Sequence, residues 1–595
     1  MKKIHATLIA VISLISMFGF YNFESEIVGG GFSISGGHIT ENTTWYHSQS
    51  PYYIEGDVYV DENITLTIEP GVDVRFNGGN GLYIDGFLNA VGTSNRIINF
   101  SSNKTSPTTS DWEGIQINST GHAEISYCNI TYANYSICLS HTSNNNITNN
   151  NISSGSIYGI YLDHSQNNHI KANNIFSIWF SCIRLSSSSN NDIIDNDIFQ
   201  SELWDGINLL SSSNNNSIVD NRIFSHTKYG IYLDSSSNNS IIKNHVYSNG
   251  EENIYIVLSS DNNLIMENNV SDSNIGIELS SSENNTVICN KVFSHSTVGI
   301  FLLSSSNNDI MKNNILENNL GIHMFSNSHY NQICHNNIMD NTNQALDDQN
   351  DNIWNHSYPK GGNYWSDFDE SGEGAYDEYI GEDQDMLGSD GIVDNGTIGG
   401  GGKNPYIIDS DSQDNYPLIH PYLENSTYLQ QGWNLISIPF LQSNTSLEAV
   451  LQSIGGEYNT LQYYNASDRN KSWKHHHISK PYHLNDFTEI NHKIGFWIHI
   501  ITSGGILFNY SGKRPFQNQT IPLHPGWNMV GYPSLNRYNR TDGLNNLTFG
   551  DHVDVIWSYN AAIQKWEKMG ESDNFIMGRG YYIHAKSECT WEVPL

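Results

Sequence analysis

Residues 167–175 read NNHIKANNI, and this phrase returns along the chain with Val or Leu in place of some Ile residues. Its first apolar position recurs at a spacing of roughly 23 residues, which is typical of a repeat array. A Gly-Ile pair or a variant follows most copies, as at Gly206-Ile207. Each period thus holds two alternating apolar segments separated by Asn, Ser and Gly, which predicts short strands rather than helices. The repeated apolar positions are Ile147, Ile170, Ile193, Ile218, Ile241, Ile265, Val287, Ile310 and Ile333.

Short strands at this period predict an all-β fold, a right-handed single-stranded parallel β-helix with coils stacked about 4.8 Å apart. A leucine-rich repeat shares the period, but it needs a helix-forming half that runs of Ser and Asn disfavour. One Asn of the phrase recurs in every coil, where its amide can hydrogen-bond to the coils above and below. We interpret this column as structural rather than catalytic: Asn150, Asn173, Asn196, Asn221, Asn244, Asn268, Asn290, Asn313 and Asn336.

The composition agrees with such an architecture. Only 15% of the 595 residues are charged, yet 62 acidic residues face 27 basic ones, for a net charge of −35. Neutral Asn and Ser replace the missing charge, and 12% aromatic residues argue against a disordered chain. The net negative charge argues against nucleic acid as a partner, because a phosphate backbone requires clustered Lys and Arg.

The N-terminus predicts export. Lys2 and Lys3 precede an apolar run from Ile4 to Phe20, which indicates a signal peptide or an uncleaved N-terminal anchor over residues 1–22. Many N-glycosylation sequons, such as that at Asn42, suit a secreted or cell-surface glycoprotein. We expect membrane contact only through this N-terminal segment.

A second internal repeat begins at residue 421. GWNLISIP at 432–439 is restated as GWNMVGYP at 526–533, and GFWIH at 495–499 is restated as GYYIH at 580–584. Matched phrases in the same order predict two small tandem β domains with aromatic residues in their cores. The expected boundaries are 40–350 for the β-helix, 351–420 for an acidic Gly/Asp-rich segment, and 421–515 and 516–595 for the two modules.

The Asn-Ile phrase, GGNYWSD at 361–367 and DNYPL at 414–418 together resemble the NosD-type periplasmic copper-binding family. That family belongs to the carbohydrate-binding and sugar-hydrolysis β-helices, which have a pectin lyase-like fold. The resemblance implies a β-helix and, through the founding members that help to mature nitrous oxide reductase, copper as a cofactor. A shared fold does not by itself carry function. The G-W-N modules resemble those that end other archaeal exported proteins.

Two kinds of metal site follow from residue chemistry. Copper requires His, Met or Cys gathered in space, whereas the histidines of the coils are scattered along the chain. Calcium is suggested by the acidic segment, where Asp383, Asp385, Asp390 and Asp394 surround a Gly turn with alternating carboxylates. A solvated acidic linker remains the alternative, because the spacing departs from that of an EF-hand loop.

The positions after each Gly-Ile pair predict an outward column of aromatic and hydrogen-bonding side chains, which suits the faces and hydroxyls of sugar rings. Simple packing on a β-surface is the alternative. Asp205, with Arg184 nearby, is the best candidate for a catalytic acid, although no paired-carboxylate motif is visible. The candidate ligand-binding residues are Tyr161, Trp179, Arg184, Trp204, Asn208, Tyr232, Tyr255 and Glu278.

Three functional hypotheses follow. The first is a non-catalytic exported surface protein whose β-helix flank binds glycan or another envelope component. The second is a polysaccharide lyase or hydrolase on the same face. The third is copper handling of the type that accompanies nitrous oxide reductase maturation, as the family resemblance implies.

Overall fold

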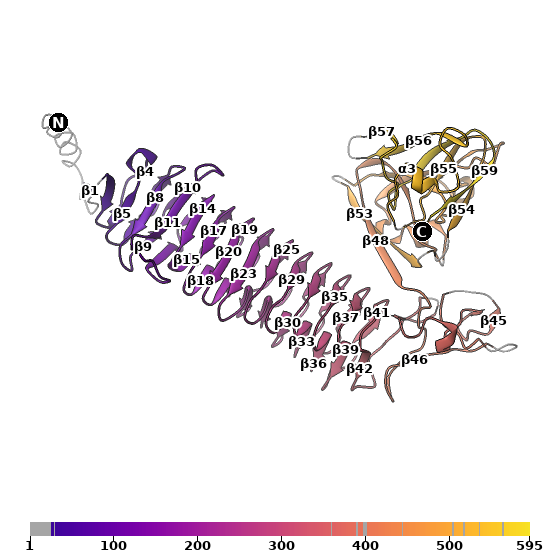
Figure 1. Ribbon diagram of the computed structural model, residues 1–595, viewed down its shortest axis with the longest axis horizontal. Coiled ribbons are helices and arrows are strands. Elements are labelled where there is room, and N and C mark those ends of the chain that lie inside the picture. The colour runs from indigo at the N-terminus through magenta and orange to yellow at the C-terminus, as the bar shows by residue number, and fades with distance from the viewer. Residues whose placement is uncertain are drawn as a thin grey trace. The chain divides into compact units, whose positions relative to one another are not determined.

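The computed structural model describes residues 25–28, 30–358, 360–387, 391–396, 401–442, 444–502, 505–513, 515, 518–534, 536–561 and 564–594 (Figure 1). The expected signal peptide or anchor over residues 1–22 lies outside these ranges. Within them, no helix combines the length and hydropathy needed to cross a membrane. The chain forms two compact units, one ending at His356 and including Tyr406–Asn415, the other comprising Ser357–Pro405 and Tyr416–Leu595.

The first unit is a right-handed parallel β-helix of about 14 coils with about 23 residues each, which confirms the fold expected from the repeat. Each regular coil contributes one strand to each of three parallel sheets, and each strand pairs with its equivalent in the next coil. Alternating residues point inward, so the repeated Ile and Val positions stack into a continuous core, as Ile170 beside Ile193 illustrates.

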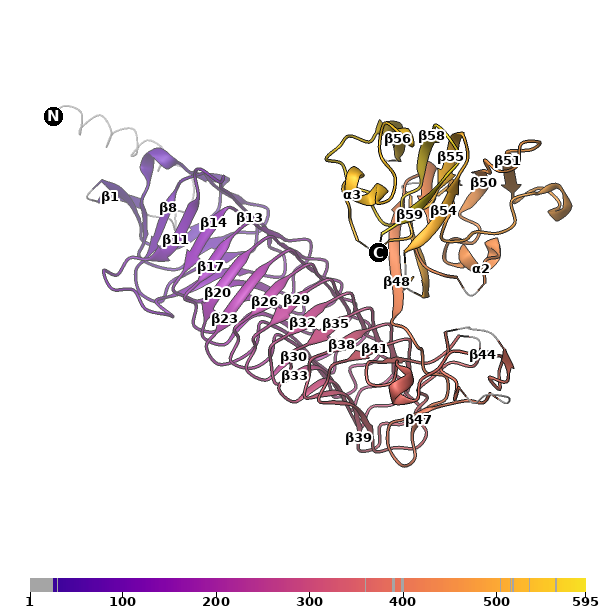
Figure 2. The same ribbon diagram turned by 45° about the vertical axis from the view of Figure 1, so that its right-hand side comes forward.

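The first sheet begins with one antiparallel pair and continues in parallel. Its later strands follow one another along one side of the helix (Figure 2). The order is β1 (Ser25–Val28), β2 (Gly31–Ile34), β5 (Tyr52–Ile54), β8 (Asp73–Phe76), β11 (Ile98–Ser102), β14 (Cys128–Thr131), β17 (Asn151–Ser153), β20 (Asn174–Ile178), β23 (Asp197–Ser201), β26 (Arg222–Phe224), β29 (His245–Tyr247), β32 (Asn269–Ser271), β35 (Lys291–Phe293), β38 (Asn314–Leu316) and β41 (Asn337–Met339).

The second sheet carries the first apolar position of each phrase at the centre of a short strand. Its order is β4 (Thr43–Trp45), β7 (Thr65–Ile68), β10 (Phe87–Val91), β13 (His122–Ser126), β16 (Asn146–Thr148), β19 (His169–Lys171), β22 (Asp192–Ile194), β25 (Ser217–Val219), β28 (Ser240–Ile242), β31 (Leu264–Met266), β34 (Thr286–Ile288), β37 (Asp309–Met311) and β40 (Gln332–Cys334). A 3-10 turn, η1 (His47–Gln49), follows β4.

The third sheet contains the Gly-Ile positions and has the longest strands of the repeat. Its order is β3 (Gly37–Ile39), β6 (Val58–Val60), β9 (Gly81–Ile84), β12 (Trp112–Ile117), β15 (Ala133–Ser140), β18 (Tyr158–Asp163), β21 (Ser181–Ser186), β24 (Ile207–Leu210), β27 (Ile231–Asp234), β30 (Glu252–Val257), β33 (Ile275–Ser280), β36 (Val298–Leu303), β39 (Leu320–Phe325) and β42 (Asn343–Asp347).

Buried asparagines close the turns between the second and first sheets. The Asn244 Oδ1 accepts the backbone N–H of Asn221 at 2.9 Å and its Nδ2 at 3.0 Å, and the Asn244 Nδ2 donates to the Ile218 carbonyl at 2.8 Å. The same bonds join every consecutive pair from Asn150 to Asn336. Each coil therefore satisfies the turn amides of the coil before it.

The structure adds a second ladder at another corner, formed by the second Asn of the phrase. Each of these residues accepts the backbone N–H of its equivalent in the preceding coil. Its members are Asn145, Asn168, Asn191, Asn216, Asn239, Asn263, Asn285, Asn308 and Asn331.

The acidic segment contains only short elements. They are β43 (Tyr364–Trp365), η2 (Ser371–Glu373), β44 (Tyr379–Ile380) and β45 (Met386–Leu387) in the second unit, and β46 (Tyr406–Ile407) and β47 (Gln413–Asp414) in the first unit.

The rest of the second unit consists of small antiparallel sheets, as the duplicated phrases predict. One module pairs β48 (Tyr422–Leu429) with β53 (Ile506–Lys513) and orders its second sheet β49 (Gly432–Ser437), β52 (Gly495–Ile500), β50 (Tyr458–Tyr464), β51 (Trp473–His477). The other repeats this with β54 (Gln519–Leu523) and β59 (Cys589–Val593), then β55 (Gly526–Val530), β58 (Tyr581–Ala585), β56 (Val553–Asn560), β57 (Lys565–Lys568). The short helices are α2 (Leu447–Val450), η3 (Gln452–Ile454), η4 (Tyr482–Leu484) and α3 (Arg540–Leu544).

The G-W-N motif has a structural role in both modules. Gly432 and Gly526 adopt φ values of 93° and 98°, which favour glycine. The following Asn closes the turn: the Asn434 Nδ2 donates to the Gln430 carbonyl at 2.8 Å, and the Asn528 Nδ2 donates to the His524 carbonyl at 2.7 Å.

Candidate functional site

The outward face of the third sheet aligns the candidate ligand-binding residues. Parallel register places Tyr161 beside Arg184, and Arg184 beside Asn208. The line continues without a shift through Tyr232 and Tyr255, one residue in each coil. It then reaches Glu278 in β33. These side chains therefore share one face because the Gly-Ile pair holds the same register in successive coils.

Two groups of tyrosines occupy this face. In the first, the Tyr158 ring centre lies 5.1 Å from that of Tyr161 and 5.8 Å from that of Tyr135. In the second, the Tyr229 ring centre lies 5.1 Å from those of both Tyr232 and Tyr255. We call the surface formed by both groups and the polar residues between them the tyrosine face; it comprises Tyr135, Tyr158, Tyr161, Arg184, Asp205, Asn208, Tyr229, Tyr232, Glu252, Tyr255 and Glu278.

A polar trio separates the two tyrosine groups. The Asn208 Nδ2 donates to the Asp205 Oδ2 at 2.6 Å, and the Arg184 guanidinium lies 5.2 Å from the Tyr158 ring centre. Burial raises the pKa of Asp205 to about 6, although its hydrogen bond from Asn208 opposes the shift. The Asn208 Oδ1 is buried and has no hydrogen-bond partner among the described residues. A buried acceptor without a partner is costly, and this one lies beneath the surface of the face.

Two further acids, which the column pattern only partly predicted, are Glu252, in the same strand as Tyr255, and Glu278, in the next coil. Burial raises the pKa of Glu252 to about 7, and neighbouring Glu251 adds to the shift. Burial, followed by the charge of Glu252, raises the pKa of Glu278 to about 8. At pH 7 the Glu278 carboxyl therefore keeps its proton and can donate a hydrogen bond. The signal for Glu252 in the sequence is its place two coils after Asp205, at the equivalent position of the coil.

Trp179 and Trp204 lie in adjacent coils on turns that lead into the third sheet, and both are exposed. The Lys228 Nζ lies 5.1 Å from the Trp204 ring centre. These two indoles therefore border the tyrosine face at the turns rather than standing in its column.

The described residues among the expected calcium ligands differ in their surroundings. Asp394 is buried, and its Oδ2 accepts the backbone N–H groups of Glu378 at 2.6 Å and Tyr379 at 2.7 Å. Asp383 and Asp385 are exposed, and Asp390 lies outside the described residues. In the described part of the acidic segment, no three carboxylates converge within 4.8 Å.

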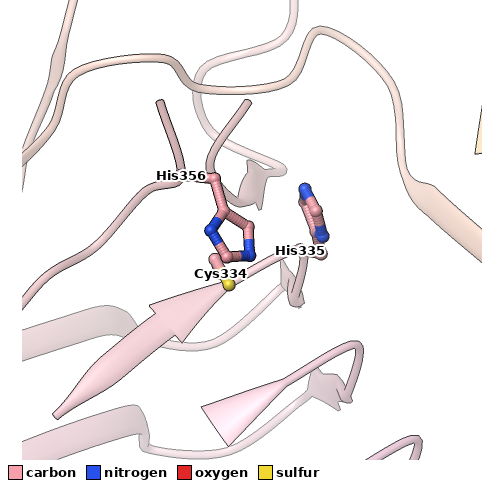
Figure 3. Close-up of side chains that lie close together, drawn as sticks. All are labelled: Cys334, His335 and His356. Carbon is pink, nitrogen blue, oxygen red and sulfur yellow. The ribbon is translucent and has the colours of Figure 1, made fainter. Parts of the chain in front are cut away.

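A different set of metal-binding side chains does converge, as Figure 3 shows. Ligand atoms of Cys334, His335 and His356 all lie within 4.8 Å of one another. Cys334 ends β40, His335 follows it in a turn with a φ of 58°, and His356 comes from the segment after the last coil. Cys334 and His335 are buried and His356 is half-buried. His356 lies 21 positions after His335 in the sequence, and the fold brings these two histidines together.

A thiolate with two imidazoles fits copper, which accepts both ligand types. Sequence reasoning missed this group because the Cys-His dipeptide interrupts the Asn repeat without any metal-binding spacing. His141, Asp163 and His164 form a second converging trio on the β-helix, but both of its histidines are exposed.

An aromatic cleft lies between the two C-terminal modules. It has a volume of about 410 Å³ and is lined by Trp473, Trp497, Trp527, Trp557, Trp566 and Tyr582. Trp497 is 9% exposed, as expected for a core residue, but Trp527 is 39% exposed and belongs to the cleft rather than to the core.

A family model described as periplasmic copper-binding protein (NosD) matches residues 36–227, 89–274 and 205–370, more than half of the chain in total. The chain belongs to the NosD family. The resemblance drawn from the repeat and the GGNYWSD phrase is confirmed. NosD is a periplasmic family, which indicates an extracytoplasmic location for this member.

This NosD member is also similar to parts of individual proteins. It is 42% identical over 66 residues to Protein bark beetle of Drosophila melanogaster. That match covers 11% of this chain and 2% of the other protein. The periplasmic alginate epimerase AlgG is similar with a TM-score of 0.35 and 13% identity, covering 58% of this chain and 81% of AlgG. The A-module of the Azotobacter vinelandii mannuronan C-5 epimerase AlgE6 is similar with a TM-score of 0.34 and 11% identity, covering 52% of this chain and 89% of that module.

Proposed function

We propose that this NosD family member is an exported β-helix protein that binds a glycan chain along the tyrosine face. The observation that carries the proposal is the arrangement of two tyrosine groups on one face of the third sheet, on either side of Arg184. Flat rings receive the C–H faces of sugars, and the half-buried Arg184 guanidinium between them can donate to hydroxyls.

The length of the face supports a polymer rather than a single sugar. From Tyr161 to Glu278 the line advances one residue per coil over six coils. At about 4.8 Å per coil, this spans about 24 Å along the helix axis. A surface of that length contacts several consecutive sugar rings.

The test is binding of the purified protein to an array of polysaccharides, followed by calorimetry with any polymer retained. Tyr232→Ala removes one stacking ring, and we expect affinity to fall about tenfold, since an aromatic contact contributes about 1.5 kcal/mol. Tyr247→Ala is the matched control, because Tyr247 stacks on Phe224 on the first sheet, at 4.9 Å between ring centres. Retention of no polymer, or an equal loss in both variants, would refute the proposal.

A catalytic use of the same face is favoured by one observation, the raised pKa values of Asp205 and Glu278, which suit proton transfer near neutral pH. Asp205→Asn should then abolish the release of new chain ends from the bound polymer while leaving its binding affinity within about threefold. Absence of turnover by the unmodified protein on the polymer that it binds would exclude a lyase or hydrolase.

A further inference from the structure

The two C-terminal modules pack together through one face of each four-stranded sheet. Leu435 and Trp497 from one module and Met529 from the other form a buried apolar cluster, against which Tyr559 and Tyr582 pack. The other face of each sheet lies on the module's own hydrophobic core. The aromatic cleft of about 410 Å³ opens beside the shared cluster, since Trp497 and Tyr582 belong to both.

The two modules contribute equivalent residues to this cleft. Trp473 in β51 corresponds to Trp566 in β57, and Trp497 in β52 corresponds to Tyr582 in β58. Strand register places Trp557 beside Tyr582, so these two rings leave the same face of the sheet. The Trp566 ring plane stands at 85° to that of Trp497 and at 87° to that of Tyr582. A bound molecule therefore meets ring faces and ring edges from both modules rather than one flat platform.

The chemistry of the walls restricts what can bind. Five of the six lining side chains are indoles, whose N–H groups donate hydrogen bonds and whose rings accept none. The sixth, Tyr582, keeps its hydroxyl proton because burial raises the pKa of the phenol. Trp473, Trp527 and Trp566 are exposed, so a ligand can reach the rings from solvent. The cleft thus offers apolar surface together with hydrogen-bond donors.

We propose that this aromatic cleft binds a proline-rich segment of a partner protein in the polyproline II conformation. A proline residue has a carbonyl that accepts from an indole N–H, and it has no backbone N–H that would need an acceptor in the cleft. Its ring packs between aromatic side chains, and the polyproline II helix is formed before binding, so little conformational entropy is lost.

Two other ligands match the cleft less well. Sugar hydroxyls donate as well as accept, whereas the five indoles accept nothing. A quaternary ammonium ion is attracted to ring faces, but a positive charge already stands beside them. Lys568 is exposed and pairs with Trp557 in the strand register, so both side chains leave the same face of the sheet. This ammonium group repels a cationic ligand and attracts an acidic residue next to the prolines.

The test is calorimetric titration of the purified protein with a synthetic peptide of ten prolines that ends in aspartate. A Gly-Ser peptide of equal length and charge is the control ligand. We expect only the proline peptide to bind, with a blue shift of tryptophan fluorescence as the indoles leave water. Trp527→Ala should weaken binding about 30-fold, the loss typical of a central aromatic anchor. Trp566→Phe keeps a ring but loses the N–H donor, and should weaken binding about fivefold.

Tyr330→Ala is the matched control variant, because Tyr330 is an exposed aromatic residue of the β-helix outside the cleft. Lys568→Glu adds a variant that leaves every ring in place, and it should favour a proline peptide that ends in lysine over one that ends in aspartate. Circular dichroism establishes that each variant is folded.

Three results would overturn the proposal. The first is equal binding, or no binding, of the proline and Gly-Ser peptides. The second is an equal loss of affinity in Trp527→Ala and Tyr330→Ala. The third is a fluorescence shift with maltohexaose or tetramethylammonium, but not with the proline peptide, that Trp527→Ala abolishes. All of these readouts concern the second unit and none uses the tyrosine face, so the result is independent of the proposed function.

Discussion

The asparagine ladder offers the sharpest test of how the repeat holds the β-helix together. Asn244→Ala removes the side chain that accepts from the Asn221 N–H and Nδ2 and donates to the Ile218 carbonyl. A buried N–H without its acceptor costs about 1–3 kcal/mol, and each remaining lost bond costs about 0.5–1.5 kcal/mol. We expect the coils around the substitution to lose about 4 kcal/mol of local stability.

A long repeat array need not unfold in one step, so the midpoint of global thermal or denaturant unfolding does not measure a local loss of stability. Native-state hydrogen exchange measures it directly at the amides of the second and first sheets near residues 218–246. At about 1.4 kcal/mol per factor of ten, exchange should accelerate by up to about a thousandfold in these coils. Coils several turns away should change little, because each coil contacts only its neighbours.

Asn319→Ala provides the matched control, since Asn319 is an exposed asparagine of the same β-helix whose backbone N–H donates to the His295 carbonyl. If exchange near residue 221 in Asn244→Ala differs from that in the control by less than about threefold, the ladder does not stabilise the coils as argued.

Three other predictions concern separate regions. Glu278 has a folded-state pKa of about 8 against an ordinary 4.5, so the stability that its protonated form contributes is present below about pH 4.5 and is lost as pH rises through 8. The free energy of unfolding of the unmodified protein should therefore fall between pH 5 and pH 9, and Glu278→Gln should remove at most about 5 kcal/mol of that fall. The exposed Glu283→Gln should leave the fall unchanged. Equal pH profiles for Glu278→Gln and the unmodified protein would contradict the raised pKa of Glu278. Asp394→Asn should destabilise the second unit by about 3 kcal/mol, because the carboxylate accepts backbone N–H groups, and Asp383→Asn should not; a midpoint that calcium raises only in the unmodified protein would instead support calcium binding. Asn528→Ala should lower the free energy of unfolding of the last module by about 2 kcal/mol, because the turn at 524–528 loses the hydrogen bonds of the Asn528 side chain. Calorimetry measures this change, and an unchanged transition would show that the G-W-N motif does not stabilise the module through this turn.

Local chemistry made much of the candidate site predictable. The column from Tyr161 to Glu278 follows from a constant register, since a residue one position after each Gly-Ile pair must point outward in every coil. Burial was not predictable in this way. The sequence marked Asp205 and Glu278 as site candidates but gave no sign that burial would raise the pKa of each, or that the charge of Glu252 would add to the rise at Glu278.

The acidic segment shows the limit of counting charges. Asp383, Asp385 and Asp394 alternate along the chain as calcium ligands do, yet the chain uses Asp394 to bind its own backbone and leaves the other two in solvent. Spacing along an irregular loop does not determine where carboxylates point, because no periodic backbone relates them.

The amino-acid sequence alone specified the coil, its period, the asparagine ladder and the duplicated modules, because each depends on contacts that recur at a constant spacing. The tertiary structure decided which unique residues meet. His356 reaches Cys334 and His335 only where the chain leaves the last coil, and Trp527 faces a cleft only because two modules pack together. Each of these contacts occurs once in the chain, so no periodic pattern in the sequence predicts it. Only the folded structure shows that these residues lie side by side.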